Sequence, residues 1–331
     1  MALPKPSLNC NAARLFPIVM TATHLSLKDQ PQLEFVDCPH PEGHHRMAYW
    51  RWGNAQAQRV LVCAHGLTRQ GRDFDRLAQA LVAQSTEALQ VICPDVAGRG
   101  QSEWLNNPAL YQIPQYAADM LAMLGQVQAQ LGSLPMQSLD WVGTSMGGLI
   151  GMVLAGQPGL PLPAPFRRLV LNDVGPAIAW GSVQRMQTYV GQYGQYRDLD
   201  EAAAALWALS SGFGPVPVDV WREMSAHMTR PGTDGHLTLH YDPAIAVGLR
   251  AMTPETAAAG EATLWALYDQ IQAQTLLIRG AESDLLMPET ALAMTQRGPR
   301  ARLDTWPGFG HAPTLTGEDQ IRALASFLLS D

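Results

Sequence analysis

The feature that most constrains the fold of this chain is the regular alternation of short apolar runs with amphipathic segments. The runs are continuous, as expected for strands buried on both faces of a parallel sheet, and the segments between them have apolar residues at helical spacing. This alternation predicts an α/β fold with a doubly wound, mostly parallel sheet and right-handed crossovers. The expected strands are residues 59–66, 89–95, 139–143, 167–175, 274–284 and 301–306, and the expected helices are residues 73–84, 115–131, 146–157, 288–298 and 317–330.

The longest stretch without this alternation runs from residue 176 to residue 263. A structureless loop of that length is improbable in a compact domain. Three parts of it instead have helix-like sequences separated by Gly and Pro, namely 182–193, 200–211 and 216–230. We therefore expect a helical cap inserted into the core. The chain then divides into an N-terminal extension (1–30), an α/β core (31–175 and 264–331) and the cap (176–263).

Residues 33–39 and 46–53 predict an antiparallel hairpin ahead of the parallel strands. The expected turn between them, "HPEGHH", contains His40, His44 and His45. We interpret these histidines as solvated turn residues and expect no metal site.

Composition excludes several classes of function. The chain has 331 residues, of which 47% are hydrophobic and 15% are charged, with a formal net charge of −7. It lacks the basic surface that a nucleic-acid-binding protein needs, and no apolar stretch reaches the roughly 18 residues that span a bilayer. Cys63 and Cys93 lie in apolar runs, and Cys10 and Cys38 have no metal-like spacing. A reduced, cytoplasmic protein is therefore expected.

The segment "WVGTSMGGLIG" at 141–151 places Ser145 between Gly143 and Gly147, where an expected strand passes into an expected helix. A serine on such a tight turn adopts a strained backbone conformation, and side chains two residues on either side would collide. Glycine at both positions removes the collision, and the amides at the start of the helix point to where an oxyanion would form. Ser145 is therefore the candidate nucleophile.

An acidic residue and a histidine follow Ser145 at the ends of later strands. Asp284 follows "LLIRGAES" and His311 follows "LDTWPGFG". Functional groups gather at the carboxyl ends of the strands in an open parallel sheet, so we expect His311 as the general base and Asp284 as the acid that orients it. Asp173, in "LNDVG", is the alternative acid, and Asp95 is expected to have a structural role.

Five segments together resemble the α/β-hydrolase fold superfamily, specifically its serine-nucleophile, carboxylesterase-like members with a helical cap. These segments are "HG" at 65–66, "PDVAGRGQS" at 94–102, "GTSMGG" at 143–148, "RGAESDLL" at 279–286 and "GFGHAP" at 308–313. The resemblance covers the chain from about residue 33 onward. It implies an oxyanion hole formed by the backbone N–H groups of Leu67 and Met146.

The resemblance also implies an activity. Dehalogenases and epoxide hydrolases of the superfamily carry aspartate where this chain has Ser145, so the expectation is a hydrolase that cleaves carboxylic esters through an acyl-serine intermediate without a metal or organic cofactor. The expected partner is a small-molecule ester with a short-to-medium acyl or aromatic group, aliphatic polyester oligomers included. Carbon–carbon bond hydrolases, perhydrolases and acyltransferases of the same fold are alternatives, as is a non-catalytic ligand receptor.

Two further groups of residues bear on the substrate. Arg69 and Arg72 lie just beyond the expected oxyanion loop and are candidates either for binding a substrate carboxylate or for flanking a helix. The expected cap is rich in aromatic residues and methionine, most of which should hold it together while some line the substrate pocket: Trp180, Met186, Tyr189, Tyr193, Tyr196, Trp207, Phe213, Trp221, Met224 and Met228.

Overall fold

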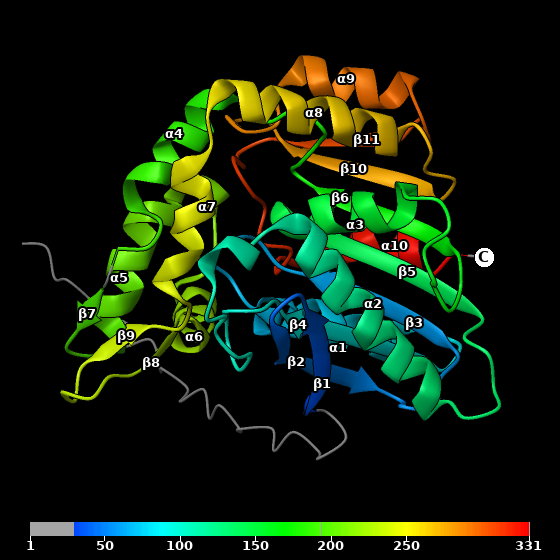
Figure 1. Cartoon of the computed structure of the whole chain (residues 1–331), viewed down its shortest axis with the longest axis horizontal. Helices are drawn as coiled ribbons and strands as arrows, with labels where there is room; N and C mark the ends of the chain where they lie inside the picture. Colours follow the sequence, from blue (N-terminus) through cyan, green and yellow to red (C-terminus); the bar gives the residue numbers. More distant parts are fainter. Residues whose placement is uncertain (1–29, 193, 331) are drawn as a thin grey trace, which may run out of the picture.

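The structure is a computed structural model that describes residues 30–192 and 194–330. Nearly all of the expected extension at 1–30 therefore lies outside the described residues. An eight-stranded sheet forms the core, in the order β1-β2-β4-β3-β5-β6-β10-β11 (Figure 1). Its strands are β1 (Gln32–His40), β2 (Gly43–Gly53), β3 (Arg59–Ala64), β4 (Leu89–Asp95), β5 (Ser138–Thr144), β6 (Phe166–Asn172), β10 (Gln274–Gly280) and β11 (Arg302–Trp306).

The direction of the strands confirms the expected mostly parallel sheet. β1 pairs antiparallel with β2, and β2 pairs antiparallel with β4. All the remaining neighbours in this sheet are parallel. The expected hairpin is present, but its strands extend further than predicted and leave only residues 41 and 42 between them.

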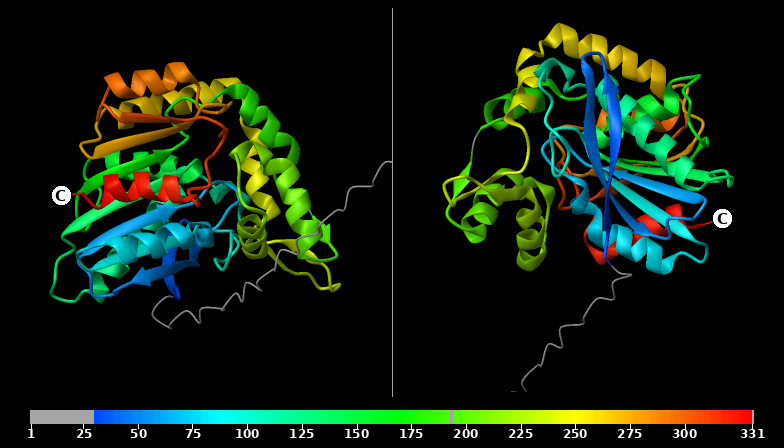
Figure 2. Two further views of the ribbon diagram at one scale, coloured as in Figure 1. Left: turned by 180° about the vertical axis from the view of Figure 1, so that it is seen from behind. Right: turned by 60° about the horizontal axis from the view of Figure 1, so that its bottom comes forward.

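Helices cover both faces of the sheet, which confirms the doubly wound arrangement (Figures 1 and 2). The first face carries α1 (Asp75–Gln84) and α10 (Glu318–Leu328), whose buried hydrophobic residues belong to one cluster. The other face carries α2 (Ile113–Gln130), α3 (Met146–Gly156), α8 (Pro254–Tyr268) and α9 (Pro288–Gln296), whose buried hydrophobic residues belong to a second, larger cluster.

Most of the insertion between β6 and β10 lies beyond one end of the sheet strands in Figure 1. It contains α4 (Trp180–Tyr189), α5 (Leu199–Ser210), α6 (Val218–Met228) and α7 (Ala246–Ala251), and the first three match the expected helices. It also contains a small antiparallel sheet of β7 (Gln195–Tyr196), β9 (Leu237–Leu239) and β8 (Thr229–Pro231). Strands of two or three residues are too short to produce an alternating pattern, so the sequence did not indicate them.

α8 changes the expected end of the cap. It runs without interruption through the predicted boundary between residues 263 and 264, and it packs against α3 of the core. Most of its residues are exposed around the whole helix, so the sequence has no apolar stripe to reveal it. The signal that was present is local: Thr253 and Thr256 form a capping box, and Pro254 follows the cap residue.

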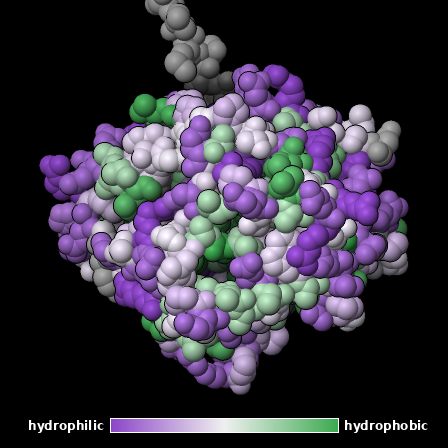
Figure 3. Space-filling model, turned by 90° about the horizontal axis from the view of Figure 1, so that it is seen from above, coloured by the Kyte–Doolittle hydropathy of each residue, from purple (hydrophilic) through white to green (hydrophobic). Residues whose placement is uncertain are grey.

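Large apolar residues that are exposed on the surface are mostly isolated from one another. Figure 3 shows one face of the molecule, on which hydrophilic and hydrophobic residues are interspersed. The most exposed large apolar residues, Val218 at 84% and Leu209 at 61%, both belong to the insertion. Among the described helices, none combines the length and the apolar character that crossing a membrane requires.

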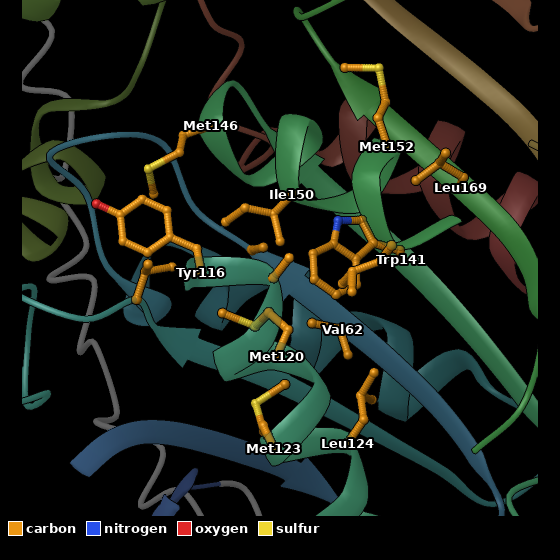
Figure 4. Close-up of a cluster of buried hydrophobic side chains, with 14 of the residues drawn as sticks. Val62, Tyr116, Met120, Met123, Leu124, Trp141, Met146, Ile150, Met152 and Leu169 are labelled. Carbon is orange, nitrogen blue, oxygen red and sulfur yellow. The ribbon is translucent and has the colours of Figure 1, made fainter. Parts of the chain in front are cut away.

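Trp141 is the largest fully buried side chain among the described residues and belongs to the larger cluster (Figure 4). It lies on β5, is fully buried, and packs among residues of the sheet, α2 and α3. Its indole N–H donates a hydrogen bond of 3.0 Å to the carbonyl of Gly147 in the first turn of α3. Gly151, one turn further along α3, has no room for a side chain because a Cβ atom would press on the indole. Trp141 therefore fixes how closely α3 approaches β5.

We expect Trp141→Phe to lower the free energy of unfolding by about 2–4 kcal/mol, because it removes the donor to the Gly147 carbonyl and leaves a void beside α3. Urea unfolding followed by circular dichroism measures the change. Trp104→Phe is the matched control, since Trp104 is 39% exposed, and we expect it to cost less than about 1 kcal/mol. Equal losses in the two variants would contradict the packing role of Trp141.

Candidate functional site

Ser145 occupies a strained turn between β5 and α3. Its φ is 52° and its ψ is −118°, a left-handed conformation that non-glycine residues rarely adopt. A Cβ atom on Gly143 would run into the carbonyl of Gly147, and a Cβ atom on Gly147 would run into the carbonyl of Ala64 on β3. The two glycines are therefore required by close backbone packing, for the reason that the sequence suggested.

Hydrogen bonds join Ser145, His311 and Asp173 in a row. The Oγ of Ser145 lies 2.9 Å from Nε2 of His311, and Nδ1 of His311 lies 2.7 Å from Oδ2 of Asp173. With the Nδ1–H donated to the carboxylate, Nε2 is free to accept the serine proton. The arrangement can therefore move a proton from Ser145 to an imidazole whose charged form faces a carboxylate.

Asp173 is held by a set of donors at the end of β6. Its side chain is fully buried. Oδ1 accepts the backbone N–H of Gly280 at 2.8 Å, and Oδ2 accepts the hydroxyl of Ser283 at 2.5 Å in addition to His311. These contacts fix the carboxylate in position, and they compensate for removing it from water.

The expected position of the acid needs correction, because Asp284 does not contact His311. Asp284 lies in the loop after β10, with a half-exposed side chain that forms an ion pair with Arg185 of α4. Its backbone carbonyl accepts the Ser182 hydroxyl at 2.6 Å. This loop therefore turns outward to meet the insertion, and the residue beside the histidine is the alternative acid, Asp173.

The order of the strands explains this difference. β6 lies between β5 and β10, so the residue directly after β6 is one strand nearer to the turn after β5 than the residue directly after β10. The residue that ends β10 is Gly280, where a side chain would run into the backbone of Phe309 and Gly310. β10 consequently contributes a backbone N–H to Asp173 and no carboxylate of its own.

The loop after β3 carries Leu67, one of the two residues expected to form an oxyanion hole. His65, at the start of this loop, is fully buried. Its Nδ1–H donates to the carbonyl of Gly66 at 2.7 Å, and its Nε2 accepts the N–H of Val96 at 2.9 Å. Burial lowers the pKa of His65 to about 3, so the imidazole is neutral and makes both contacts at physiological pH. The loop is thereby tied to the end of β4.

Met146, the other expected oxyanion residue, is the first residue of α3. The N–H groups in the first turn of a helix have no partner within the helix, so the Met146 N–H is free of intrahelical bonding. It follows Ser145 directly, as the family pattern requires.

Arg99 is a residue of this region whose role the sequence reasoning missed. Its guanidinium is fully buried. Nε donates to the carbonyl of Leu67 at 2.8 Å, and Nη1 donates to the carbonyl of Ala97 at 2.6 Å and to the hydroxyl of Tyr116 at 2.9 Å. Nη2 lies 3.7 Å from the sulfur of Met146. Arg99 thus contacts both residues expected to form the oxyanion hole. The sequence did contain one indication of this role, because Arg99 lies within the segment "PDVAGRGQS" that resembles the family.

Asp95 lies in the same segment and has the structural position that the sequence suggested. Its Oδ1 accepts the backbone N–H of Gly71 at 2.7 Å, and its Oδ2 accepts that of Gln101 at 2.9 Å. Burial raises the pKa of Asp95 to about 6, against the lowering effect of these two N–H donors. The carboxylate therefore ties the loops after β3 and β4 together.

A cavity of about 270 Å³ opens above Ser145 and His311. Its core side includes Leu67 and Arg69, and its other walls come from the insertion. Trp207 and Trp221 belong to the insertion's own hydrophobic cluster, whereas Tyr193 lies outside the described residues. The aromatic and methionine residues of the insertion that line the cavity are Met186, Tyr189, Tyr196, Phe213, Met224, Met228 and also Tyr241, which the sequence analysis did not single out.

Arg69 and Arg72 occupy different positions relative to the cavity. Arg69 lines the cavity and pairs with Asp73. Arg72 pairs with Asp75 at 2.6 Å and lies over the ring of Trp50, outside that cavity. Of the two arginines, only Arg69 is placed to meet a molecule bound near Ser145.

The interpretation of His45 as a solvated turn residue was wrong. His45 lies in β2 directly opposite Cys38 of β1, and both side chains are buried on the same face of the sheet, as paired residues of neighbouring strands share a face. His45 Nε2 lies 3.1 Å from Oδ2 of the buried Asp119. Among the described residues, Cys38, His45 and Asp119 are the group whose potential metal-ligating atoms lie closest together, within 4.8 Å of one another. His44, in contrast, is exposed.

The chain matches a family model described as the alpha/beta hydrolase fold over residues 59–318. It is 46% identical over 300 residues to the 3-hydroxybutyrate-oligomer hydrolase of Cupriavidus necator. The aligned region covers 90% of this chain and 97% of that protein. An alpha/beta hydrolase from Novosphingobium aromaticivorans is 30% identical with a TM-score of 0.75, and a putative hydrolase from Rickettsia typhi is 25% identical with the same TM-score. Each of these two comparisons covers 90% of this chain and 98% of the other.

The parallel sheet, the glycine-flanked Ser145 and the matches over most of the chain lead to one assignment. The chain belongs to the α/β hydrolase fold family, and it is an ester hydrolase.

Proposed function

We propose that this enzyme is a serine hydrolase that cleaves carboxylic esters through an acyl-serine intermediate. The observation that carries the proposal is the hydrogen-bonded row of Ser145, His311 and Asp173 at the base of the cavity. A serine hydroxyl is a weak nucleophile unless a base removes its proton as it attacks. His311 is within hydrogen-bonding distance to act as that base, and Asp173 holds the imidazole in the required orientation.

The first half of the reaction acylates the enzyme. Ser145 Oγ attacks the ester carbonyl, and its proton passes to Nε2 of His311. The oxyanion of the tetrahedral intermediate accepts hydrogen bonds from the N–H groups of Leu67 and Met146. As the carbon–oxygen bond to the alcohol breaks, His311 gives its proton to the departing oxygen and the acyl group remains on Ser145.

The second half restores the enzyme with water. His311 removes a proton from a water molecule, which attacks the acyl-serine carbonyl. The second tetrahedral intermediate collapses, the carboxylic acid is released, and His311 returns the proton to Ser145 Oγ. Arg99 acts through the residues around it: by holding the Leu67 carbonyl, it sets the direction of the loop that supplies one of the oxyanion N–H groups.

We propose short-to-medium acyl esters as substrates, with oligomers of 3-hydroxybutyrate among them. The relative from Cupriavidus necator carries that substrate in its name. The size of the cavity, about 270 Å³, supports a short substrate, because it lies just below the roughly 300–1,000 Å³ of ordinary ligand pockets. The apolar and aromatic side chains of the insertion favour an aliphatic acyl chain on their side of the cavity.

We also infer that the enzyme works in a reducing compartment, the cytoplasm. The three described cysteines, Cys38, Cys63 and Cys93, are free thiols. Cys63 and Cys93 lie in the neighbouring strands β3 and β4, and burial raises the pKa of Cys93. Both thiols are buried in the core, which suits a protein that needs no oxidised cysteine for stability.

The first test concerns the nucleophile. We expect Ser145→Ala to fold normally and to lose at least about 10³-fold in kcat for a chromogenic ester, because covalent catalysis is lost. A serine-directed phosphonate should add to Ser145 alone, as judged by mass spectrometry of its peptides. The exposed Ser133 provides the control, since Ser133→Ala should keep full activity and labelling. Full activity in the Ser145→Ala variant would refute the mechanism.

The second test separates the two acids. We expect Asp173→Asn to lower kcat by about 10⁴-fold, because the amide holds the histidine in the wrong tautomer. Asp284→Asn should change kcat less than about tenfold, since an exposed pair such as Asp284–Arg185 contributes little. Both variants are measured with the same ester, together with their thermal unfolding. The opposite ranking would return the role of the acid to Asp284.

The third test concerns the acyl group. Each methylene that enters the apolar cavity can contribute up to about 0.8 kcal/mol. We therefore expect kcat/KM for p-nitrophenyl esters to rise from acetyl to medium chains and then to fall, because the insertion encloses the site. A continuous rise up to sixteen carbon atoms would indicate an open lipase site. Failure to cleave any ester would favour carbon–carbon bond cleavage, acyl transfer or ligand reception instead.

A further inference from the structure

Arg69 is a charged side chain in the cavity that the proposed reaction steps do not use. The residue is only 8% exposed, and it lines the cavity together with Ser145 and His311. A Cβ atom built on Gly66 would lie 3.6 Å from Cβ of Ser145 and 3.7 Å from Cγ of Arg69. The side chains of Ser145 and Arg69 therefore both lie next to Gly66, so a small substrate can contact both.

The guanidinium of Arg69 has hydrogen-bond donors to spare. Nε donates to Oδ2 of Asp73 at 2.5 Å, and Nη2 donates to Oδ1 at 2.8 Å. Nη1 faces the thioether sulfur of Met228, which is only a weak acceptor. Burying a charged donor without a strong acceptor is unfavourable. A carboxylate oxygen placed at Nη1 would supply that acceptor.

The charged residues around the cavity are compatible with binding of an anion. Both oxygens of Asp73 are already bound by Arg69. Arg185 also lines the cavity and pairs with the half-exposed Asp284. Arg69 lies 5.5 Å from the ring of Trp221, so apolar and aromatic groups shield the guanidinium from water. Charge-assisted hydrogen bonds are stronger in such surroundings than in water.

We propose that Arg69 binds the free carboxylate of an acidic ester substrate and thereby determines specificity. The proposal rests on the ester-hydrolase function above and deepens it: the preferred substrates are short, anionic esters of hydroxy acids, in which a carboxylate lies a few atoms from the bond that is cut. Neutral esters of the same size lack the group that Arg69 recognises. Asp73 acts as a positioning residue that holds the fork of the guanidinium and leaves Nη1 toward the cavity.

The experiment compares the linear dimer of 3-hydroxybutyrate, which has a free carboxylate, with its neutral methyl ester, and it follows only cleavage of the ester bond that joins the two hydroxybutyrate units. For the wild-type enzyme we expect kcat/KM to be about 10- to 100-fold higher for the free acid, which corresponds to one hydrogen bond to a charged group. The difference should lie mainly in KM. Free 3-hydroxybutyrate should also inhibit hydrolysis of p-nitrophenyl butyrate competitively, and more strongly than its methyl ester does.

The variant Arg69→Gln/Asp73→Asn removes both charges of the pair, so no unpaired carboxylate is left buried. We expect the ratio of kcat/KM values for the two dimers to fall to about one. The matched control is Arg72→Gln/Asp75→Asn, which removes the neighbouring ion pair outside the cavity and should keep the wild-type ratio. Arg69→Lys keeps the charge but loses the planar fork, and it should retain a reduced preference for the free acid.

Three outcomes would overturn the proposal. The ratio of kcat/KM values for the two dimers could be near one in the wild-type enzyme, or it could be unchanged in the Arg69→Gln/Asp73→Asn variant. It could also fall equally in both double variants. The wild-type ratio and the inhibition by 3-hydroxybutyrate need no variant, so they decide the matter even if the double variant fails to fold. Failure of the proposed function looks different. In that case neither dimer nor any p-nitrophenyl ester is cleaved, and Ser145 is not labelled by a phosphonate.

Discussion

The close contact between the turn at Ser145 and the strands beneath it is the constraint on which the rest of this molecule depends. Gly147 lies so near the carbonyl of Ala64 that no side chain fits between them, and the indole of Trp141 holds the carbonyl of the same glycine. These contacts keep Ser145 in a backbone conformation that would otherwise relax. The buried core and the hydroxyl of Ser145 are therefore parts of one packing arrangement, and a loss of side-chain volume on β5 should change the position of Ser145.

A second level of organisation comes from the loops, which support one another across the carboxyl end of the sheet. Arg99 holds the carbonyl of Leu67, and its own segment is tied to the insertion: Gly100 N–H donates to the carbonyl of His240 at 3.0 Å, and Asp242 N–H donates to that of Gly98 at 2.7 Å. The insertion is thus bonded to the loop that positions the expected oxyanion residues.

The two ion pairs near the cavity differ in their surroundings, and this difference gives them different uses. The Arg185–Asp284 pair joins α4 to the loop after β10 with both side chains half exposed, so water and salt weaken it. The Arg69–Asp73 pair is almost completely buried, and its Nη1 donor faces the sulfur of Met228, which lines the same cavity as Ser145. The first pair links the insertion to the core, whereas the second provides a fixed charge for recognising a substrate.

The sequence by itself determined the alternation of strands and helices, the position of the insertion, and the placing of Ser145 and His311 at strand ends, because burial on both faces and tight glycine turns leave local patterns. Three things depended on the tertiary structure. The acid beside His311 is Asp173 because β6, not β10, is the neighbour of β5. The order of the strands in the sheet cannot be predicted from the local sequence of any one strand. α8 escaped notice because a helix exposed around most of its surface has no apolar stripe. Finally, Arg69 and Arg72 are three residues apart and alike in sequence, and only the folded chain directs the first toward the cavity and the second toward Trp50.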